Sequence, residues 1–234
     1  MDFRELKATL RGIASPERAK VTRSFFKTEP GEYSEGDRFL GIRIPDLRSL
    51  VKQADAVSLK ESLILLRSEW HEERLMALLL MERRFERAAD EFVQEEIVKA
   101  YLANTRWVNN WDLVDVSAPT ILGAWVLTRK RTVLGDLVRS ENLWERRIGI
   151  VSTLTLIRSG EFRDALHLTG KLLRDPEDLM HKACGWMLRE VSKKDRDVLV
   201  AFLEEKATRM PRTMLRYAIE RFPEQERRRW LAVR

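Results

Sequence analysis

Arg146-Arg-Ile-Gly149 joins a basic residue to a small residue through two spacers, and the same pattern recurs along the chain. It returns 36 residues later as Lys182-Ala-Cys-Gly185 and lies 72 residues earlier as Arg74-Leu-Met-Ala77. A small residue at a fixed place in each copy lets two helices approach closely. The offsets of one and two periods therefore indicate an internal repeat of about 36 residues.

A period near 36 with two helices per unit is typical of HEAT-like repeats, whose units are usually about 40 residues long. Stacked helix pairs bury a continuous core and leave a concave face for binding. No sustained two-residue alternation predicts a sheet. We therefore expect an all-α fold, a HEAT-like superhelix or α-solenoid, with an irregular helical bundle as the alternative. No low-complexity segment or long linker is visible, so residues 1–234 are expected to form a single domain.

Composition narrows the classes of function. The chain has 234 residues, is 44% hydrophobic and 34% charged, and has a formal charge of +6 and a sequence pI of about 9.6. This basic balance permits binding to nucleic acid, membrane surfaces or acidic proteins without choosing among them. One cysteine and three histidines make a disulfide framework or a multi-ligand metal site improbable. Without an apolar leader or membrane-length run, we expect a cytoplasmic protein, monomeric by default, with no metal or cofactor.

Local signals mark several helix ends and one long loop. Ser15-Pro-Glu17 predicts an N-cap followed by proline at the first helical position, and Ser58-Leu-Lys-Glu61 predicts a capping box. Residues 28–44 contain one proline and three glycines and are expected to form a loop, whose role stays open. Pro119 and Gly123 are expected to interrupt an otherwise apolar segment that continues to Leu127.

The repeat pattern is broken at its central copy. A further copy would begin at Asn110, but acidic and aromatic residues replace it in Trp107-Val-Asn-Asn-Trp-Asp-Leu-Val-Asp115. If this segment is helical from Trp111, then Trp111 and Asp115 share one face at positions i and i+4. An indole beside a carboxylate suits a flat, positively charged reaction centre, because both attract cations. We therefore interpret this face as one that contacts a cationic damaged base and its sugar.

Each candidate residue also has a structural interpretation. Asp115 would otherwise be a helix N-terminal carboxylate or a surface ion-pair partner, and Asp112, offset by about 100° from Trp111, is expected to be structural and to bond backbone amides. By pattern alone, a tryptophan in the position of Trp186 packs in the core more often than it faces a ligand. Of Arg146 and Arg147, one can pair with Glu145 or solvent, while the other reaches a phosphate.

Several catalytic motifs are absent. The chain contains no Gly-x-x-x-x-Gly-Lys phosphate loop, no dinucleotide fingerprint and no His-Glu-x-x-His metal motif. Cys184 has no evident histidine partner for nucleophilic catalysis, and its place in the repeat predicts core packing. These absences argue against nucleotide-dependent and metal-dependent chemistry of those kinds.

With these residues in view, the chain resembles the AlkD-type alkylpurine DNA glycosylases, also called DNA alkylation repair enzymes. Three separated signatures carry the resemblance and span most of the chain in order: Phe25 to Arg48, Asn109 to Asp115 with Pro119 to Gly123, and Asn142 to Gly149 with Lys182 to Glu190. The resemblance implies a HEAT-like superhelix with a concave basic face. It also implies removal of N7- and N3-alkylated purines from duplex DNA by cleavage of the N-glycosidic bond.

The resemblance also implies roles for individual residues. Asp115 matches the family's catalytic aspartate, Trp111 and Trp186 match the two tryptophans that contact the damaged nucleotide, and Arg147 matches the arginine that holds the DNA backbone. Further backbone contacts are implied for Arg43, Arg48 and Arg189. Some relatives bind DNA without the activity, so a noncatalytic DNA-structure binder remains the alternative, and a protein-binding helical scaffold remains a third. Preferred adducts, acceptance of bulky lesions and DNA affinity stay open.

Overall fold

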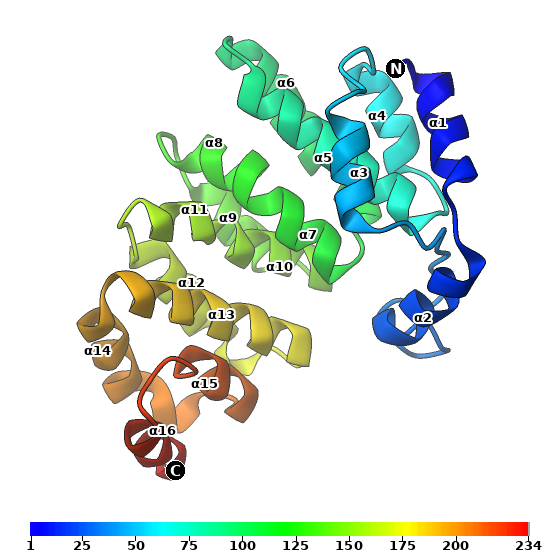
Figure 1. Cartoon of the computed structure of the whole chain (residues 1–234). Helices are drawn as coiled ribbons and strands as arrows, with labels where there is room; N and C mark the ends of the chain where they lie inside the picture. Colours follow the sequence, from blue (N-terminus) through cyan, green and yellow to red (C-terminus); the bar gives the residue numbers. More distant parts are fainter. Residues whose placement is uncertain (234) are drawn as a thin grey trace. The chain divides into compact units, whose positions relative to one another are not determined.

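The computed structural model describes residues 1–233, and the regular elements within them are helices joined by loops (Figure 1). Extended pairing is limited to one isolated bridge between Arg38 and Trp70. The expected all-α class is therefore confirmed for the described residues. None of the helices in this range is both long enough and apolar enough to span a lipid bilayer.

The chain divides into two compact units, Met1–Ser117 and Ala118 onward, each with its own packed interior. In the first unit α5 is the central helix, because α3, α4 and α6 all pack against it. Its core is built from leucine, methionine and isoleucine side chains together with Tyr101, all almost fully buried. The helices are α1 (Phe3–Gly12), α2 (Pro16–Phe26), α3 (Ile44–Val51), α4 (Leu59–Leu66), α5 (His71–Arg87), α6 (Glu91–Leu102) and α7 (Trp111–Ala118), with a 3-10 turn at Thr105–Trp107.

In the second unit α13 is the central helix, and it packs against α10, α11, α14 and α15. Met180, Ala183 and Cys184 on α13 are fully buried, which agrees with the core packing expected for Cys184. The helices are α8 (Ala124–Val126), α9 (Thr132–Leu137), α10 (Leu143–Val151), α11 (Thr153–Arg158), α12 (Arg163–Lys171), α13 (Asp178–Lys194), α14 (Arg196–Lys206), α15 (Arg212–Ala218) and α16 (Glu224–Ala232), with 3-10 turns at Leu172–Arg174 and Ala207–Arg209.

Predicted helix starts agree with the structure. Ser15 caps α2 by accepting from the amide of Arg18, and Pro16 occupies the first helical position. Ser58 and Glu61 form the expected reciprocal capping box at the start of α4. These caps satisfy backbone N–H groups that have no partner inside the helix, and each contributes about 1 kcal/mol.

The expected interruption at Pro119 and Gly123 is a change of helix type rather than a break in the helix. Residues Pro119–Gly123 form a turn of π-helix that joins α7 to α8. A wider turn accommodates a proline inside a helix, because proline lacks the N–H that a regular turn needs. The turn's polar groups are also paired, since Thr155 Oγ1 donates to the Pro119 carbonyl at 2.6 Å. Pro119 and Gly123 therefore mark a local irregularity, while tertiary contacts keep the segment helical.

The repeat inferred from sequence is visible in matching hydrogen bonds of the two units. Ser68 donates to Glu73 at 2.5 Å, and Ser140, 72 residues later, donates to Glu145 at 2.5 Å. Arg74 donates to the Ser68 carbonyl at 3.0 Å, and its counterpart Arg146 donates to the Ser140 carbonyl at 3.1 Å. The same side chains therefore build the same helix start in both copies.

The small residue permits close packing in the two copies that have glycine, Gly149 and Gly185. A Cβ atom added at Gly149 would lie 2.8 Å from Val138 Cγ1. One added at Gly185 would lie 2.5 Å from the Cβ of Tyr217 and 2.6 Å from the carbonyl oxygen of Met214. Real Cβ atoms do not approach so closely, so glycine is what allows α13 to contact α15 at this point.

Candidate functional site

The first candidate residues lie at the start of α7, in the first unit. The segment is helical from Trp111, as predicted, so Trp111 and Asp115 lie one turn apart on the same face. Both residues are half-buried. Asp115 is near the buried Tyr101, whose pKa is raised chiefly by burial and to a smaller extent by the charges of Glu82 and Asp115. An indole and a carboxylate thus share one partly accessible helix face.

Trp111 rests on an aromatic platform that sequence reasoning missed. Its ring is stacked on Phe26 with centroids 5.3 Å apart and an interplanar angle of 18°. Phe25 meets the same indole edge-on at 6.1 Å and is itself 65% exposed. The adjacent pair Phe25-Phe26 at the end of α2 was the available signal, but nothing in the sequence indicated that α2 would lie against Trp111. Stacking of this kind restricts the indole to one orientation.

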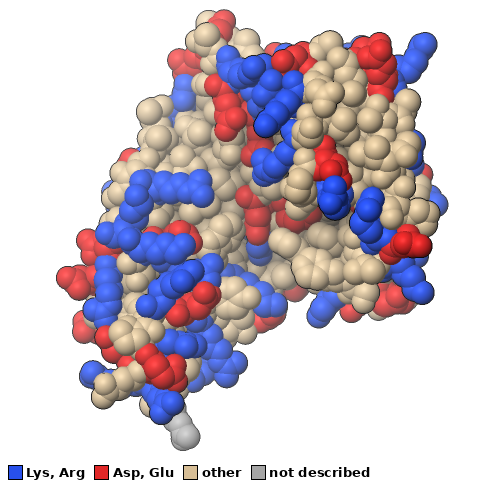
Figure 2. Space-filling model, viewed as in Figure 1, with Lys and Arg blue, Asp and Glu red and all other residues tan. Residues whose placement is uncertain are grey.

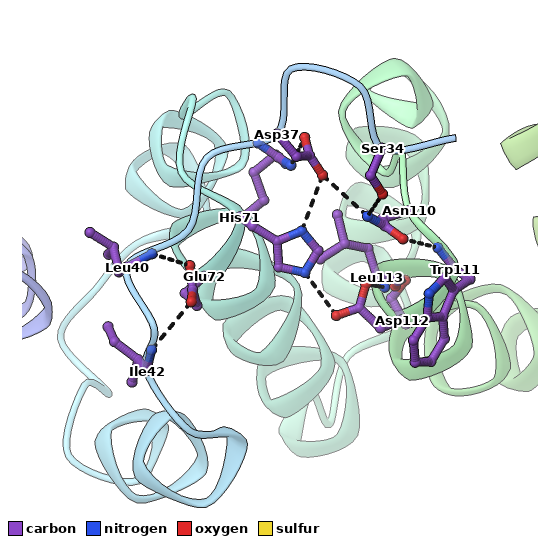
Figure 3. A network of polar contacts seen from close by, with 12 residues as sticks. Ser34, Asp37, Leu40, Ile42, His71, Glu72, Asn110, Trp111, Asp112 and Leu113 are labelled. Carbon is purple, nitrogen blue, oxygen red and sulfur yellow. Dashed lines mark hydrogen bonds and ion pairs between the residues drawn. The ribbon is translucent and has the colours of Figure 1, made fainter. Parts of the chain in front are cut away.

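A buried polar network holds the backbone on both sides of Trp111 (Figure 3). Asn110, fully buried, accepts from the Trp111 amide at 2.8 Å and donates to Ser34 at 2.6 Å and to Asp37 at 3.2 Å. Asp112 accepts from the Leu113 amide at 2.9 Å. Asp112 is therefore structural and bonds a backbone amide, as expected. Its other oxygen lies 2.8 Å from His71 Nε2.

His71 is the centre of that network. Burial alone lowers the pKa of its imidazole, but the charge of Asp112 and hydrogen bonds to Asp112 and Asp37 raise this pKa to about 9. Burial raises the pKa of Asp37, yet its hydrogen bond to His71 and the charge of Arg74 bring it below the ordinary value. Arg74 Nη2 donates to Asp37 at 2.7 Å. At neutral pH the network thus holds two cations and two carboxylates out of water, each paired.

The carboxylate of Glu72 holds the loop at residues 28–44 through hydrogen bonds from the loop's backbone. Glu72 is 3% exposed and accepts from the backbone amides of Leu40 at 2.8 Å, Gly41 at 2.7 Å and Ile42 at 3.2 Å (Figure 3). Gly41 has a φ of +73°, and a Cβ there would lie 2.3 Å from the carbonyl oxygen of Ser15. The loop therefore lies against α2 and α5, where Asp37 and Ser34 reach Asn110. Its structural role is to hold the start of α7.

Two further candidate residues, Arg147 and Trp186, belong to the second unit. Arg147 is 4% exposed, and its Nη1 donates to the Leu179 carbonyl at 2.7 Å. A phosphate would therefore meet only a small exposed part of this guanidinium. The neighbouring Arg146 pairs with Asp175 rather than Glu145, with Nε 2.7 Å from Oδ2. Trp186 on α13 is half-buried, and its Nε1 donates to Glu190 at 3.1 Å.

The three remaining arginines differ in their surroundings. Arg43 precedes α3, is exposed, and forms a two-point ion pair with Asp46 at 2.8 and 3.0 Å. Arg48 on α3 is exposed. Arg189 on α13 is paired with Glu220. Arg43 and Arg48 lie on the first unit's surface, whereas Arg189 shares α13 with Trp186.

The surface charge is mixed, with Lys and Arg gathered over the visible face of the second unit and Asp and Glu interspersed among them (Figure 2). Among the described residues, no three histidine, cysteine, aspartate or glutamate side chains converge as ligands for a metal ion. The first unit offers a fixed indole and a carboxylate on one helix face, and the second unit offers a half-buried indole on α13 and a buried guanidinium on α10. Such groups stabilise positive charge and bind a polyanion.

An α-helical repeat fold, with an aromatic-acidic face where one repeat is altered, defines the class of protein. A family model described as DNA alkylation repair enzyme matches residues 6–222, across both units. The chain belongs to the DNA alkylation repair enzyme family. This match confirms the family that the sequence resemblance indicated, and with it a role in the repair of alkylated DNA. The family indicates DNA as the substrate.

A solved structure has the same fold. It is described as a predicted DNA alkylation repair enzyme from Enterococcus faecalis, is 20% identical in sequence, and superposes with a TM-score of 0.70. The match covers 90% of this chain and 97% of the other. Comparison with curated proteins finds no match. At this identity the likeness establishes the α-solenoid fold alone.

Proposed function

We propose that the protein is a DNA glycosylase that excises positively charged N7- and N3-alkylated purines from duplex DNA by hydrolysing the N-glycosidic bond. The observation that carries the proposal is the pairing of Trp111 and Asp115 on one face of α7, with the indole fixed by Phe26 and the backbone fixed by Asn110 and Asp112. Preorganised groups of this kind stabilise charge without reorganising during the reaction.

The chemistry follows from the charge of the substrate. Alkylation at N7 or N3 makes the purine cationic and therefore a good leaving group that needs no protonation. As the bond breaks, positive charge develops on the deoxyribose. Asp115 supplies a negative charge to that oxocarbenium-like sugar and orients the water that attacks it. Trp111 and Trp186 contact the sugar and exclude competing solvent, since indole faces attract cations.

Arginines provide the binding part of the proposal. Arg147 holds the backbone phosphate beside the lesion, and Arg43, Arg48 and Arg189 contact neighbouring phosphates. Arg43 and Arg189 are already paired with Asp46 and Glu220, so DNA competes with those carboxylates. The protein is proposed to act as a monomer on a duplex.

The test is release of base by Asp115→Asn. Parent protein, this variant and the control Asp136→Asn are incubated with duplex DNA containing N7-methylguanine, and free base is measured over time. Asp136 is exposed and lies in the second unit, and the control substitution removes the same single negative charge as Asp115→Asn. We expect a loss of about 10² to 10³ in rate for Asp115→Asn, corresponding to roughly 3–4 kcal/mol, and parent rates for the control. Excision at the parent rate by Asp115→Asn would show that this carboxylate is not catalytic.

The noncatalytic alternatives give different outcomes in the same samples. A protein that only recognises DNA structure binds the duplex with steep salt dependence but releases no base at any time. A protein-binding scaffold shows weak DNA affinity without that salt dependence. Measuring binding at two salt concentrations beside base release therefore separates all three functions.

A further inference from the structure

The imidazole of His71 contacts a carboxylate at each ring nitrogen. Nε2 lies 2.8 Å from Asp112 Oδ2 and Nδ1 lies 3.4 Å from Asp37 Oδ2, in a residue that is 2% exposed. A neutral imidazole carries only one N–H, so two facing carboxylates fit the doubly protonated ring. The charged groups that face the ring are these two carboxylates, from α7 and from the 28–44 loop, and Arg74 of α5 itself. The α2 side contributes Phe26, which is uncharged.

One path from His71 reaches the backbone that carries Trp111. Asp112, held by His71, accepts from the amide of Leu113 in the first turn of α7. Asp37, also held by His71, accepts from Asn110, and Asn110 accepts from the amide of Trp111. Both carboxylate partners of one cation therefore connect to residues that flank the same indole (Figure 3).

A second path reaches the indole ring. The imidazole lies 5.0 Å from the Phe26 ring and is stacked on Phe39 at 4.7 Å. Phe26 in turn is stacked on Trp111 at 5.3 Å. Attraction between a buried cation and aromatic rings holds these rings close to the imidazolium. The platform beneath Trp111 thus rests on the same group that fixes the backbone around it.

We propose that His71, as an imidazolium, is a positioning residue that orients Trp111 from both sides, through its carboxylate partners and through Phe26. This rests on the proposed function, in which Trp111 contacts the sugar and Asp115 lies one turn away. When the imidazolium loses its proton, one carboxylate loses its donor and the cation beneath Phe26 disappears. The indole and the first turn of α7 then shift together, and excision slows.

The raised pKa of His71, about 9, supports this interpretation and sets where the change occurs. The positioning effect is complete at neutral pH and is lost as the pH rises through about 9. A purely structural residue would alter stability without producing a titration of the indole in the folded protein.

The first experiment measures the indole directly. Protein labelled with 5-fluorotryptophan is titrated by ¹⁹F NMR from pH 6.5 to 10, and the Trp111 resonance is assigned by its loss in Trp111→Phe. In the parent and in His167→Gln, which alters an exposed histidine of α12, we expect the Trp111 resonance to move with a midpoint near 9. In His71→Gln that resonance should be displaced at every pH and should not titrate near 9. Trp230 of α16 is the internal control and should show no such midpoint.

The second experiment measures excision of N7-methylguanine over the same pH range, with circular dichroism confirming the fold and enzyme-free DNA correcting for spontaneous loss. His71→Gln should lower the rate constant of the bound complex by about 10²-fold, the usual effect of an ångström-scale misplacement, and should lack the alkaline decline of the parent. His167→Gln should match the parent. An unchanged rate in folded His71→Gln would overturn the proposal.

The two experiments separate this proposal from the proposed function. If the parent releases no base, the glycosylase assignment fails, while the ¹⁹F titration still decides whether His71 positions Trp111. If His71→Gln does not fold, the parent titration decides alone, because a Trp111 resonance without a midpoint near 9 contradicts the proposal.

Discussion

At the scale of single residues, two aspartates three positions apart have opposite surroundings. Asp112 is 7% exposed, bonds a backbone amide and faces His71, whereas Asp115 is half-buried on the face that carries Trp111. Three positions on a helix place the two side chains about 60° apart in direction, and this offset is enough for Asp112 to be buried against His71 while Asp115 stays partly accessible.

The contrast predicts different results for the same substitution. Asp112→Asn leaves a buried imidazolium without its nearest counter-charge, and breaking a buried pair from one side costs about 3–5 kcal/mol. Asp115→Asn, at a half-buried position, should lower the free energy of unfolding by less than Asp112→Asn does. Urea unfolding at pH 7 measures both. Equal stability of the two variants would contradict the assignment of Asp112 to the structural network.

Gly185 shows how a single missing side chain fixes a helix contact. The Cβ introduced by Gly185→Ala would meet α15 at 2.5 Å, so we expect a loss of about 1–3 kcal/mol from overpacking. Gly170→Ala is the matched control within a helix, because an added Cβ there has no neighbour within 4 Å. It should stabilise α12 by about 0.5–1 kcal/mol. A thermal or urea midpoint that moves in the same direction for both variants would argue against close approach at Gly185.

At the scale of elements, a loop is made rigid by a helix that supplies its hydrogen-bond acceptors. Residues 28–43 form no helix, yet the amides of Leu40, Gly41 and Ile42 donate to Glu72 on α5, and Asp37 contacts Arg74 and His71. Buried backbone amides without partners are costly, so the carboxylate substitutes for the missing secondary structure.

Glu72→Gln should therefore loosen that loop. The amide side chain has one acceptor oxygen and turns N–H donors toward backbone N–H groups, at a cost of about 3 kcal/mol. We expect faster tryptic cleavage after Lys27 and Arg38, measured by mass spectrometry. Glu86→Gln, at an exposed position on the same helix, is the control and should be cleaved at the parent rate. If the two variants are cleaved alike, Glu72 does not hold the loop.

At the scale of the whole molecule, the net charge of +6 and the buried charges have separate consequences. Exposed arginines set how strongly a polyanion is attracted, because phosphate binding releases counterions. Buried charges set how stability changes with pH, because their protonation differs between the folded and unfolded chain.

The sign of the pH effect follows from His71. Its folded pKa, about 9, lies above its ordinary value of 6.5, so its contribution to stability is fully present below about pH 6.5. That contribution, about 3 kcal/mol, is lost as the pH rises from 6.5 through 9. Urea unfolding of the first unit's tryptophans at several pH values should show this decline in the parent and not in His71→Gln. A stability that rises over this interval would contradict a cationic His71.

Salt dependence tests the arginines. Arg48→Ala should reduce the slope of log affinity against log salt by about 0.9, the amount expected for one lost phosphate contact on duplex DNA. Arg209→Ala, which removes another exposed arginine outside the predicted DNA-binding set, is the control. Fluorescence anisotropy with a labelled duplex gives both slopes. Identical slopes in parent and Arg48→Ala would remove Arg48 from the proposed interface.

The sequence by itself determined the helical class, the repeat, the caps at Ser15 and Ser58, and the shared face of Trp111 and Asp115, because each depends on residues within one helix or one repeat. Only the tertiary structure decided that Phe26 lies under Trp111, that His71 faces Asp112 and Asp37, and that the segment at Pro119 stays helical. Those features join residues tens of positions apart, and their partners are chosen by packing and by the need to pair buried charges. Local periodicity carries no information about such choices.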